Sequence, residues 1–410
     1  MVSTENSAPA GVPFLNVIDP EFDFGSTAAL SAQAGSWYAD SPLGLLVLRY
    51  AEAQELLRDR RLDHNGRGYM EQSGVVQGPI FDWFVPMINN RDGEDHRRLR
   101  GLVTKAFTPR VIDALRPFIR AQAALMADRI ADAGVSEFVE SFADPLPLAV
   151  MCELLGVPNE DLDSFRRWTN DIGLVFSMVH GGDIIARVET AVVGLNGYVA
   201  SLMAEKAKRP GDDLISTLVA ARRSEGSDGT VSEEELRNLI VTLVFAAHDT
   251  TCHQLSSAMV TFSEHPEQWD LLARRPDLAP KAVEELMRWV PSTPIIYRCA
   301  AEDFEYGGLA VTKGTFLTMC VQTAQRDPRV VDGGDTFDIT RAGSPAPLLF
   351  GAGPHYCLGA ALARVELAEA VTALTERLSP PTIAGPVSWR PPTGIHGPNE
   401  LPLRFTSRAR

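Results

Sequence analysis

The sequence predicts a mainly α-helical fold with small β-sheets. Segments in which apolar residues recur at helical spacing dominate the chain, and strand-like segments are short and few. The most informative segment is 233–264, whose middle part, 239–247, is apolar on every side apart from Thr242. A helix that is apolar all round is a buried helix. This segment therefore predicts a long helix through the core, about 48 Å from end to end at 1.5 Å per residue.

Helical periodicity recurs from residue 50 almost to the C-terminus. The helices that it predicts are 50–58, 94–107, 111–133, 146–155, 159–179, 186–208, 213–223, 233–264, 266–274, 278–290 and 360–378. Short apolar runs predict strands at 45–49, 295–299, 316–321 and 403–405. This balance predicts packed helices accompanied by a minor β portion.

One domain is predicted, because no internal repeat and no long linker interrupts the chain. The polar stretch 224–229 is linker-like but short, and it leads into the long helix through Ser232 and Glu235, whose spacing is typical of a capping box. It is therefore interpreted as a surface loop. Residues 1–15 are expected to form a flexible N-terminal tail, and residues 16–410 a single domain.

The composition is that of an ordinary globular protein. Of 410 residues, 45% are hydrophobic and 22% charged, and 38 basic against 53 acidic residues give a formal net charge of −15. That charge argues against a general nucleic-acid binder. The first 48 residues contain no Lys or Arg, which argues against a secretory signal. No apolar run reaches about 18 residues, so no membrane span is expected.

The cysteines are five in number and lie far apart, at Cys152, Cys252, Cys299, Cys320 and Cys357. Their odd number and the lack of a CxxC spacing argue against a disulfide framework or a structural zinc site. A reducing cytoplasm is the compartment that this pattern predicts.

Cys357 stands in a glycine-rich loop directly before a predicted helix. A thiolate there could bind a metal, with backbone amides pointing at its sulfur. A nucleophilic role would need a base and an orienting group, and the sequence does not show whether His355 reaches the sulfur. Gly351 and Gly353 begin like a dinucleotide fingerprint, but no third glycine follows at the right place and Pro354 removes an amide, which argues against nucleotide binding.

Other polar residues lie in predicted apolar segments, where burial is costly unless the residue has a bonding partner or a functional role. Asp249 and Thr250 fall in the predicted long helix, where a buried acid and hydroxyl are costly unless they are bonded. Thr250 is placed to donate to the carbonyl of Ala246, one turn earlier. The alternative is a polar patch with no role beyond its own hydrogen bonds. Arg298 stands in an otherwise apolar strand, which is typical of an arginine with an anionic partner.

Two helical spacings bring charged residues onto one face. Glu285 and Arg288 are three residues apart, and His96 and Arg100 are four apart. Taken alone, the first pair is a surface ion pair of little energetic value. The second pair either holds an anion or is simply solvated.

The order of these features along the chain resembles that of the cytochromes P450, specifically the soluble bacterial type. An apolar helix with an acid–threonine pair is followed by an ExxR helix, a strand with an arginine, and the motif Phe-x-x-Gly-x-x-x-Cys-x-Gly. Phe350, Gly353, Cys357 and Gly359 meet all the fixed positions of that motif. The resemblance covers nearly the whole chain. It implies a single cytochrome P450 domain with the long central helix over a buried heme.

The resemblance also implies a role for each of these groups. Cys357 would be the axial thiolate ligand to the iron of heme b, a ligand that favours O–O cleavage. Asp249 and Thr250 would relay protons to dioxygen on the opposite side. Further heme-binding positions would be His96, Arg100, Arg298 and His355 at the propionates, with Phe350, Gly351, Gly359 and Ala246 as additional heme-site residues. Glu285, Arg288 and Arg341 would form a buried structural network.

Three departures from the family pattern stand out. Ala247 lies where the family usually has glycine, and its methyl group would narrow the oxygen groove or alter the helix kink. Ala352 and Pro347 stand where many members have histidine. Gly93 and Glu94 replace a proline-rich pair before His96, which would alter how that helix begins.

The activity implied by the resemblance is that of a heme-thiolate monooxygenase. It would hydroxylate or epoxidise a mostly apolar small molecule, such as a secondary-metabolite or terpenoid intermediate. The expected pocket residues are Trp83, Phe84, Phe176, Ile295, Ile296, Tyr297 and Ile395. The chain has no flavin or iron–sulfur motif, so electrons would come from an external ferredoxin and its reductase. The ferredoxin would dock near Arg97, Arg98, Lys105 and Arg364.

Three alternatives to this activity remain at this stage. A peroxide-driven peroxygenase would use the same heme, although such relatives often lack the acid–alcohol pair. A heme-binding protein that acts on a carrier-protein-bound substrate is the second alternative. The third is a hydrolase without heme that uses Cys357 as its nucleophile.

Overall fold

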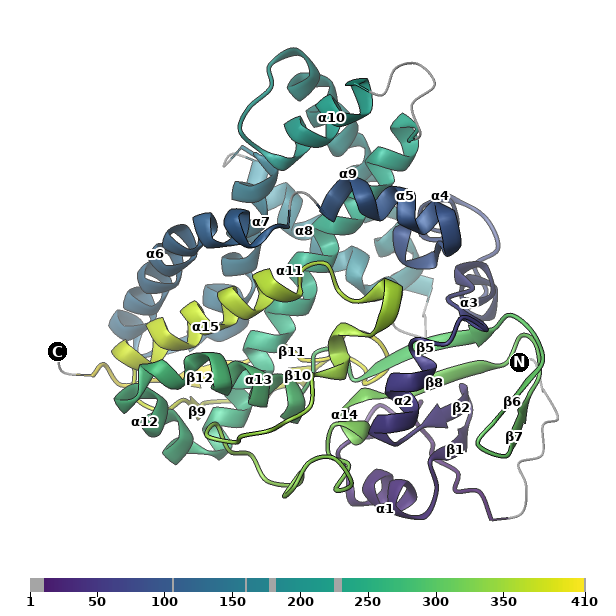
Figure 1. Cartoon of the computed structure of the whole chain (residues 1–410). Helices are drawn as coiled ribbons and strands as arrows, with labels where there is room; N and C mark the ends of the chain where they lie inside the picture. Colours follow the sequence, from purple (N-terminus) through teal and green to yellow (C-terminus); the bar gives the residue numbers. More distant parts are fainter. Residues whose placement is uncertain (1–10, 105–106, 159–160, 177–181, 225–230, 409–410) are drawn as a thin grey trace.

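The computed structural model describes residues 11–104, 107–158, 161–176, 182–224 and 231–408. Helices make up most of the molecule, and α11 (Glu233–Glu264) runs through its middle, while the main sheet lies at one side (Figure 1). The predicted mainly α-helical class with small sheets is therefore confirmed. Most of the predicted tail, most of the predicted surface loop 224–229, and Lys105 lie outside the described residues.

The helices follow the hydrophobic periodicity of the sequence. Besides α11 they are α1 (Thr27–Gly35), α2 (Tyr50–Leu56), α3 (Gly66–Gln72), α4 (Pro79–Phe84), α5 (Gly93–Thr104), α6 (Pro109–Ala133), α7 (Pro145–Leu155), α8 (Leu162–Ile172), α9 (Gly182–Lys208), α10 (Leu214–Ser224), α12 (Pro266–Arg274), α13 (Ala279–Trp289), α14 (Val321–Ala324) and α15 (Ala360–Arg377). Short helical turns are η1 (Ile88–Asn90), η2 (Val139–Ala143), η4 (Gly173–Phe176), η5 (Pro276–Leu278), η6 (Leu348–Phe350) and η7 (Gly353–His355). No described helix has both the length and the apolar character needed to cross a bilayer.

The main sheet has the strand order β1-β2-β8-β5-β3. Its strands are β1 (Tyr38–Ser41), β2 (Gly44–Val47), β3 (Leu62–Asp63), β5 (Ile295–Ala300) and β8 (Phe316–Cys320). β8 is buried along its whole length and pairs in parallel with β2 and antiparallel with β5. The smaller sheets are β4-β12-β9 (Val135–Glu137, Pro402–Arg404, Thr382–Ile383), β6-β7 (Phe304–Tyr306, Leu309–Val311) and β10-β11 (Ser388–Trp389, Pro398–Glu400).

The long helix α11 has the bounds that the sequence predicts. Ser232 accepts the amide of Glu235 (3.0 Å) and the Glu235 carboxylate accepts the amide of Ser232 (2.8 Å), so the capping box is present. Most of its side chains are buried, and its polar middle is buried with them. α11 contacts α7, α8, α9 and α15, which makes it the element around which the other helices pack.

Several predicted boundaries are corrected by tertiary contacts. Within its described part, residues 161–176, the predicted helix 159–179 is α over Leu162–Ile172 and tightens to a 3₁₀ turn at Gly173, while 159–160 and 177–179 lie outside the described residues. A Cβ atom at Gly173 would lie 2.1 Å from Oδ2 of Asp249 on α11, so the chain passes too close for any side chain. The predicted tail ends earlier than expected, because the amide of Leu15 donates to the carbonyl of Asp40 (2.9 Å) and Leu15 is buried.

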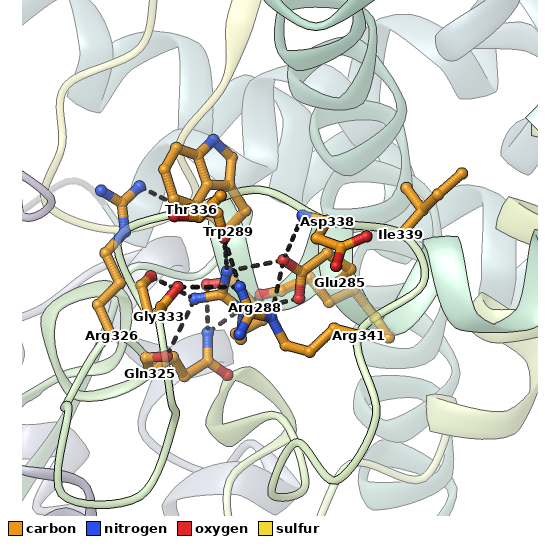
Figure 2. Close-up of polar contacts among 12 residues, drawn as sticks. Glu285, Arg288, Trp289, Gln325, Arg326, Gly333, Thr336, Asp338, Ile339 and Arg341 are labelled. Carbon is orange, nitrogen blue, oxygen red and sulfur yellow. Dashed lines mark hydrogen bonds and ion pairs between the residues drawn. The ribbon is translucent and has the colours of Figure 1, made fainter. Parts of the chain in front are cut away.

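A buried ion-pair network joins α13 to the segment that follows α14. Arg288 donates to both carboxylate oxygens of Glu285 (2.7 and 2.8 Å), and Arg341 donates to Glu285 from Nε (3.2 Å). Arg288 also donates to the carbonyl of Gly334 (2.7 Å) and to that of Thr336 (2.9 Å), the second of which is labelled in Figure 2. Glu285 thus joins Arg288 and Arg341, and these contacts hold an otherwise irregular segment against α13.

Replacement of Arg288 by Met is expected to lower the free energy of unfolding by about 3–5 kcal/mol, because Glu285 would lose its main buried partner. The urea-unfolding midpoint measures this loss. The matched control is Arg275→Met at the exposed Arg275–Asp277 pair, which should leave the midpoint almost unchanged. Equal effects of the two changes would contradict a structural role for the buried network.

Candidate active site

A cavity of about 310 Å³ lies between α11, β5 and the loop that precedes α15. Residues far apart in the sequence meet there, and most of the lining is apolar. A concave, largely apolar cavity with a few polar groups is the usual form of a small-molecule site. This cavity is therefore the candidate site for a small molecule.

Cys357 is the one cysteine among the residues that line this cavity, all of which lie in the described part of the chain. Its loop depends on Gly351 and Gly353, both with a φ of 69°, a left-handed conformation that favours glycine. The amide of Cys357 donates to the carbonyl of Phe350 (2.8 Å) and closes the loop. Phe350 and Gly359 also line the cavity, whereas Gly351 shapes the loop without lining it.

The Cys357 thiol is exposed on its cavity side and surrounded by protein elsewhere. Burial raises the pKa of the thiol, whereas amide hydrogen bonds from Gly359 and Ala360 and the charges of Arg100 and Arg364 act to lower it. A coordinated metal ion deprotonates a thiol outright. The loop therefore supplies donors to a thiolate that a bound metal would create.

α11 forms the wall that carries the candidate acid–alcohol pair. Ala246, Ala247, Thr250 and Thr251 line the cavity. The Thr250 hydroxyl donates to the carbonyl of Ala246 (2.8 Å), the back-bond that the sequence predicts. Ala247, which departs from the family pattern, is thus itself a residue of the cavity lining.

Asp249 is not among the lining residues, which differs from the expectation that it faces dioxygen directly. It is almost fully buried, and its Oδ2 accepts a hydrogen bond from Nη1 of Arg390 (2.7 Å). Nε2 of His253 lies 3.4 Å from its Oδ1. Burial alone would raise the pKa of Asp249, but Arg390 and His253 together hold it well below its usual range. Asp249 is therefore a buried carboxylate directed away from the cavity.

The predicted propionate residues gather at one end of the cavity, although only Arg298 lines it. The rings of His96 and His355 are 4.1 Å apart, and His355 contacts Asp92 (2.8 Å). Arg100 donates from Nη2 to the carbonyl of Tyr356 (2.5 Å). Burial lowers the pKa of His96 to about 4, so this imidazole is neutral at pH 7. Arg100 and Arg298 therefore supply positive charge to this cluster, and His96 does not.

An anionic group would match this end of the cavity. Arg298 is a buried cation, and its Nη1 donates to a neutral carbonyl, that of Tyr297 (2.8 Å). Burial lowers the pKa of Arg298 to about 10, so it stays charged at pH 7. Nδ1 of His64, another lining residue, is buried without a hydrogen-bond partner among the described residues. A carboxylate suits both, and the residues present therefore fit a heme with propionates at this end and iron at Cys357.

Aromatic and aliphatic side chains form the rest of the lining. The predicted pocket residues Phe176, Ile295, Ile296, Tyr297 and Ile395 all line the cavity. Trp83 and Phe84 do not line it: they lie behind it. Phe84 stacks on Tyr69 (5.3 Å) and lies 5.6 Å from Phe176, and Trp83 makes an edge contact with Phe245 (5.9 Å). The aromatic residues of α4 thus support the pocket wall instead of forming it.

The residues at or next to the cavity that were not predicted from the sequence include three with ionisable side chains, His64, Glu366 and Arg390. Glu366 lines the cavity, and burial raises the pKa of its carboxyl well above the usual range. Glu366 stands four residues after Leu362, on an apolar face of the predicted helix 360–378, and this position could have indicated a buried carboxyl group. His64 and Arg390 carried no such signal. Arg390 is 141 residues from Asp249 in sequence, and only the folded chain joins them.

The basic residues expected at the thiolate face are mostly engaged in ion pairs. Arg98 donates to Glu235 (2.5 Å) and Arg364 to Glu284 (2.5 Å). Arg97 is exposed and donates to the carbonyl of Gly93 (3.2 Å). Lys105 lies outside the described residues. Arg364 also lies over the ring of Phe350 (4.5 Å), so it contacts the thiolate loop itself.

Comparison with known proteins relates this site to one family. The family model described as "Cytochrome P450" matches residues 195–382. Luteothin monooxygenase of Streptomyces thioluteus is 45% identical over 99% of both chains. Mycinamicin IV hydroxylase/epoxidase of Micromonospora griseorubida is 36% identical over 87% of this chain and 88% of that protein.

Solved structures agree with this relationship. The crystal structure of P450BioI in complex with an acyl carrier protein ligated to hexadec-9Z-enoic acid is 29% identical and superposes with a TM-score of 0.81, covering 88% of this chain and 91% of that chain. The similarity therefore extends over nearly the whole length in both sequence and fold. The chain belongs to the cytochrome P450 family: it is a P450 monooxygenase whose cofactor is heme held by a cysteine thiolate.

Proposed function

We propose that this enzyme hydroxylates or epoxidises a largely apolar secondary metabolite, with electrons from an external ferredoxin and its reductase. One observation carries the proposal: Cys357, from the loop before α15, and Thr250, from α11, line the same largely apolar cavity. A thiolate and a hydroxyl on two sides of one cavity suit the activation of dioxygen next to an apolar substrate. Asp249 and Arg390 lie directly behind the Thr250 wall.

Cys357 is the proposed axial ligand, with Arg298, His96, Arg100 and His355 at the propionates. When bound through a thiolate, heme supplies the activation of dioxygen, because the thiolate donates electron density that favours O–O cleavage. The amides of Gly359 and Ala360 point at the sulfur and temper its donation. Arg298 provides a buried charge for a carboxylate.

Thr250 and Asp249 are the proposed proton-handling residues. The Thr250 hydroxyl is held at the cavity wall by its bond to the Ala246 carbonyl, and its oxygen remains available as an acceptor. A hydroxyl so placed can position a water or pass a proton from Asp249 into the cavity. Arg390 keeps Asp249 ionised, so the carboxylate is available to take up a proton from solvent and release it.

The apolar lining supports an apolar substrate of moderate size. Phe176, Phe245, Ile295 and Ile395 supply apolar surface, and Ser292 adds a small polar group. The relatives named luteothin monooxygenase and mycinamicin IV hydroxylase/epoxidase support a secondary metabolite as the substrate class. Luteothin is the first compound to test, with a macrolide as the second.

A monooxygenase uses dioxygen and external electrons, whereas a peroxygenase uses hydrogen peroxide. Comparing the turnover rates under these two conditions distinguishes them. With luteothin or a macrolide that shifts the heme spectrum, we expect product with a ferredoxin, its reductase and NAD(P)H. Hydrogen peroxide alone should support product formation at least about tenfold more slowly, because the chain retains groups for proton delivery. Equal rates of product formation with the ferredoxin system and with hydrogen peroxide alone would contradict the proposed electron source.

Replacement of Cys357 by Ala is expected to abolish the strongly red-shifted Soret band of the reduced carbon monoxide complex, because the proposed thiolate ligand is lost. Absorption spectra of the reduced, carbon monoxide-treated protein measure this. Cys152→Ala, a buried cysteine in α7 outside the cavity, is the control that should keep the band. A Cys357→Ala protein that keeps it would exclude Cys357 as the ligand.

Replacement of Thr250 by Ala is expected to preserve heme binding. The amount of product formed per NAD(P)H oxidised should fall about tenfold or more, because Thr250 no longer delivers protons to dioxygen. Product and NAD(P)H oxidation are measured in one assay. Thr261→Ala is the matched control: Thr261 makes the same kind of back-bond on α11, to the Ser257 carbonyl (3.1 Å), outside the cavity. Unchanged coupling in Thr250→Ala would remove Thr250 from the proton path.

A further inference from the structure

Asp249 is enclosed by groups that direct its carboxylate away from the cavity. Arg390 donates to Oδ2 (2.7 Å) and His253 contacts Oδ1 (3.4 Å). Arg390 is itself buried and well anchored: its Nε donates to Oδ1 of Asn399 (3.3 Å) and its Nη2 to the carbonyl of Asn170 (3.4 Å). The guanidinium is therefore held by groups from two other parts of the chain.

Close backbone packing completes this enclosure. Gly173, where α8 ends, approaches Asp249 so closely that a Cβ atom there would lie 2.1 Å from Oδ2 and 3.3 Å from Nη1 of Arg390. Gly397, in the segment after Arg390, approaches α11 so closely that its Cβ would lie 2.7 Å from Cβ of His253. The orientation of the carboxylate is thus determined by its cationic partner and by two backbone segments.

Arg390 also belongs to a hairpin that forms part of the cavity wall. The amide of Arg390 donates to the carbonyl of Gly397 (3.0 Å), which closes the loop between β10 and β11. At the tip of this loop, Gly394 and Ile395 line the cavity, and the amide of His396 donates to the carbonyl of Ser292, another lining residue (2.8 Å). One hairpin therefore contacts both the cavity and the carboxylate behind it.

We propose that Arg390 is a positioning residue for proton supply, which acts on the reaction through Asp249 and not by contact with the substrate. This inference rests on the proposed role of Asp249 and adds the residue that controls it. The Arg390 charge keeps a buried carboxylate ionised behind Thr250, and the hairpin fixes how far that carboxylate lies from the cavity wall. Loss of the charge leaves a buried carboxyl that stays protonated or turns, and Asp249 then no longer takes up and releases protons behind Thr250.

The test measures the reduction products of dioxygen without any organic substrate. Reduction of dioxygen to hydrogen peroxide takes two electrons and two protons, and reduction to water takes four of each, so the ratio of peroxide to water reports proton delivery. The enzyme is supplied with a ferredoxin, its reductase and NADH, and peroxide, dioxygen and NADH are measured together. In Arg390→Gln we expect this ratio to rise about tenfold, less than the contribution of a fully positioned proton donor.

A double-mutant cycle with Asp249→Asn separates positioning from general damage. If Arg390 acts only through Asp249, Arg390→Gln changes the ratio by less than about twofold in the Asp249→Asn background. This double variant also carries no unpaired buried charge, and Arg390→Lys, which keeps a positive charge, should stay closer to the wild type. The carbon monoxide spectrum establishes that each variant holds heme.

Arg166→Gln is the matched control, because Arg166 pairs with another buried carboxylate beside α11, that of Asp144, which contacts His248 and not Asp249. It should leave the ratio within about twofold of the wild type. Three outcomes would overturn the inference about Arg390 and leave the proposed role of Asp249 standing. They are an equal effect of Arg166→Gln, independent effects of Arg390→Gln and Asp249→Asn in the cycle, and a wild-type ratio in Arg390→Gln. A wild-type ratio in Asp249→Asn would refute the proposed role of Asp249 and the inference with it.

Discussion

Burial of the polar middle of α11 is the constraint on which the rest of the structure depends. A charged side chain on a helix that runs through the core needs a partner, because an unpaired buried group costs several kcal/mol, although Nδ1 of His248 and Oγ of Ser257 have no hydrogen-bond partner among the described residues. Asp249 is bonded by Arg390, and His248 on the other side contacts Asp144 (3.0 Å). These partners come from different parts of the chain. Satisfying the polar groups of α11 therefore also fixes α7, the end of α8 and the β10–β11 hairpin around it.

A second set of contacts, outside α11, attaches the thiolate loop to the fold. Arg364 on α15 pairs with Glu284 on α13 (2.5 Å) and lies over the ring of Phe350 in the loop (4.5 Å). The next residue on α13, Glu285, belongs to the buried network of Arg288 and Arg341. The stability of α13 and the placement of the loop are consequently linked through adjacent glutamates, so a structural pair and a cofactor-binding loop share one support.

The polar groups of the cavity come from different elements of the fold. The thiol comes from a glycine-shaped loop, the hydroxyl from a buried helix, and the buried cation Arg298 from a strand in the main sheet. Each of these groups is therefore placed by a different element of the fold, and most of the remaining lining is apolar. That arrangement leaves a largely apolar space between two chemically distinct walls, which suits oxygen chemistry on an apolar molecule.

The sequence by itself determined the features that depend on local pattern. The bounds of α11 and its capping box, the Glu285–Arg288 spacing, and the loop around Cys357 all follow from neighbours within a few residues. Only the tertiary structure decided the rest: that Asp249 turns to Arg390, that Trp83 and Phe84 stand behind the wall, that His64 and Glu366 join the lining, and that a helix ends at Gly173. The physical reason is that burial and ion pairing depend on which distant segments come into contact, and no short-range periodicity records those contacts.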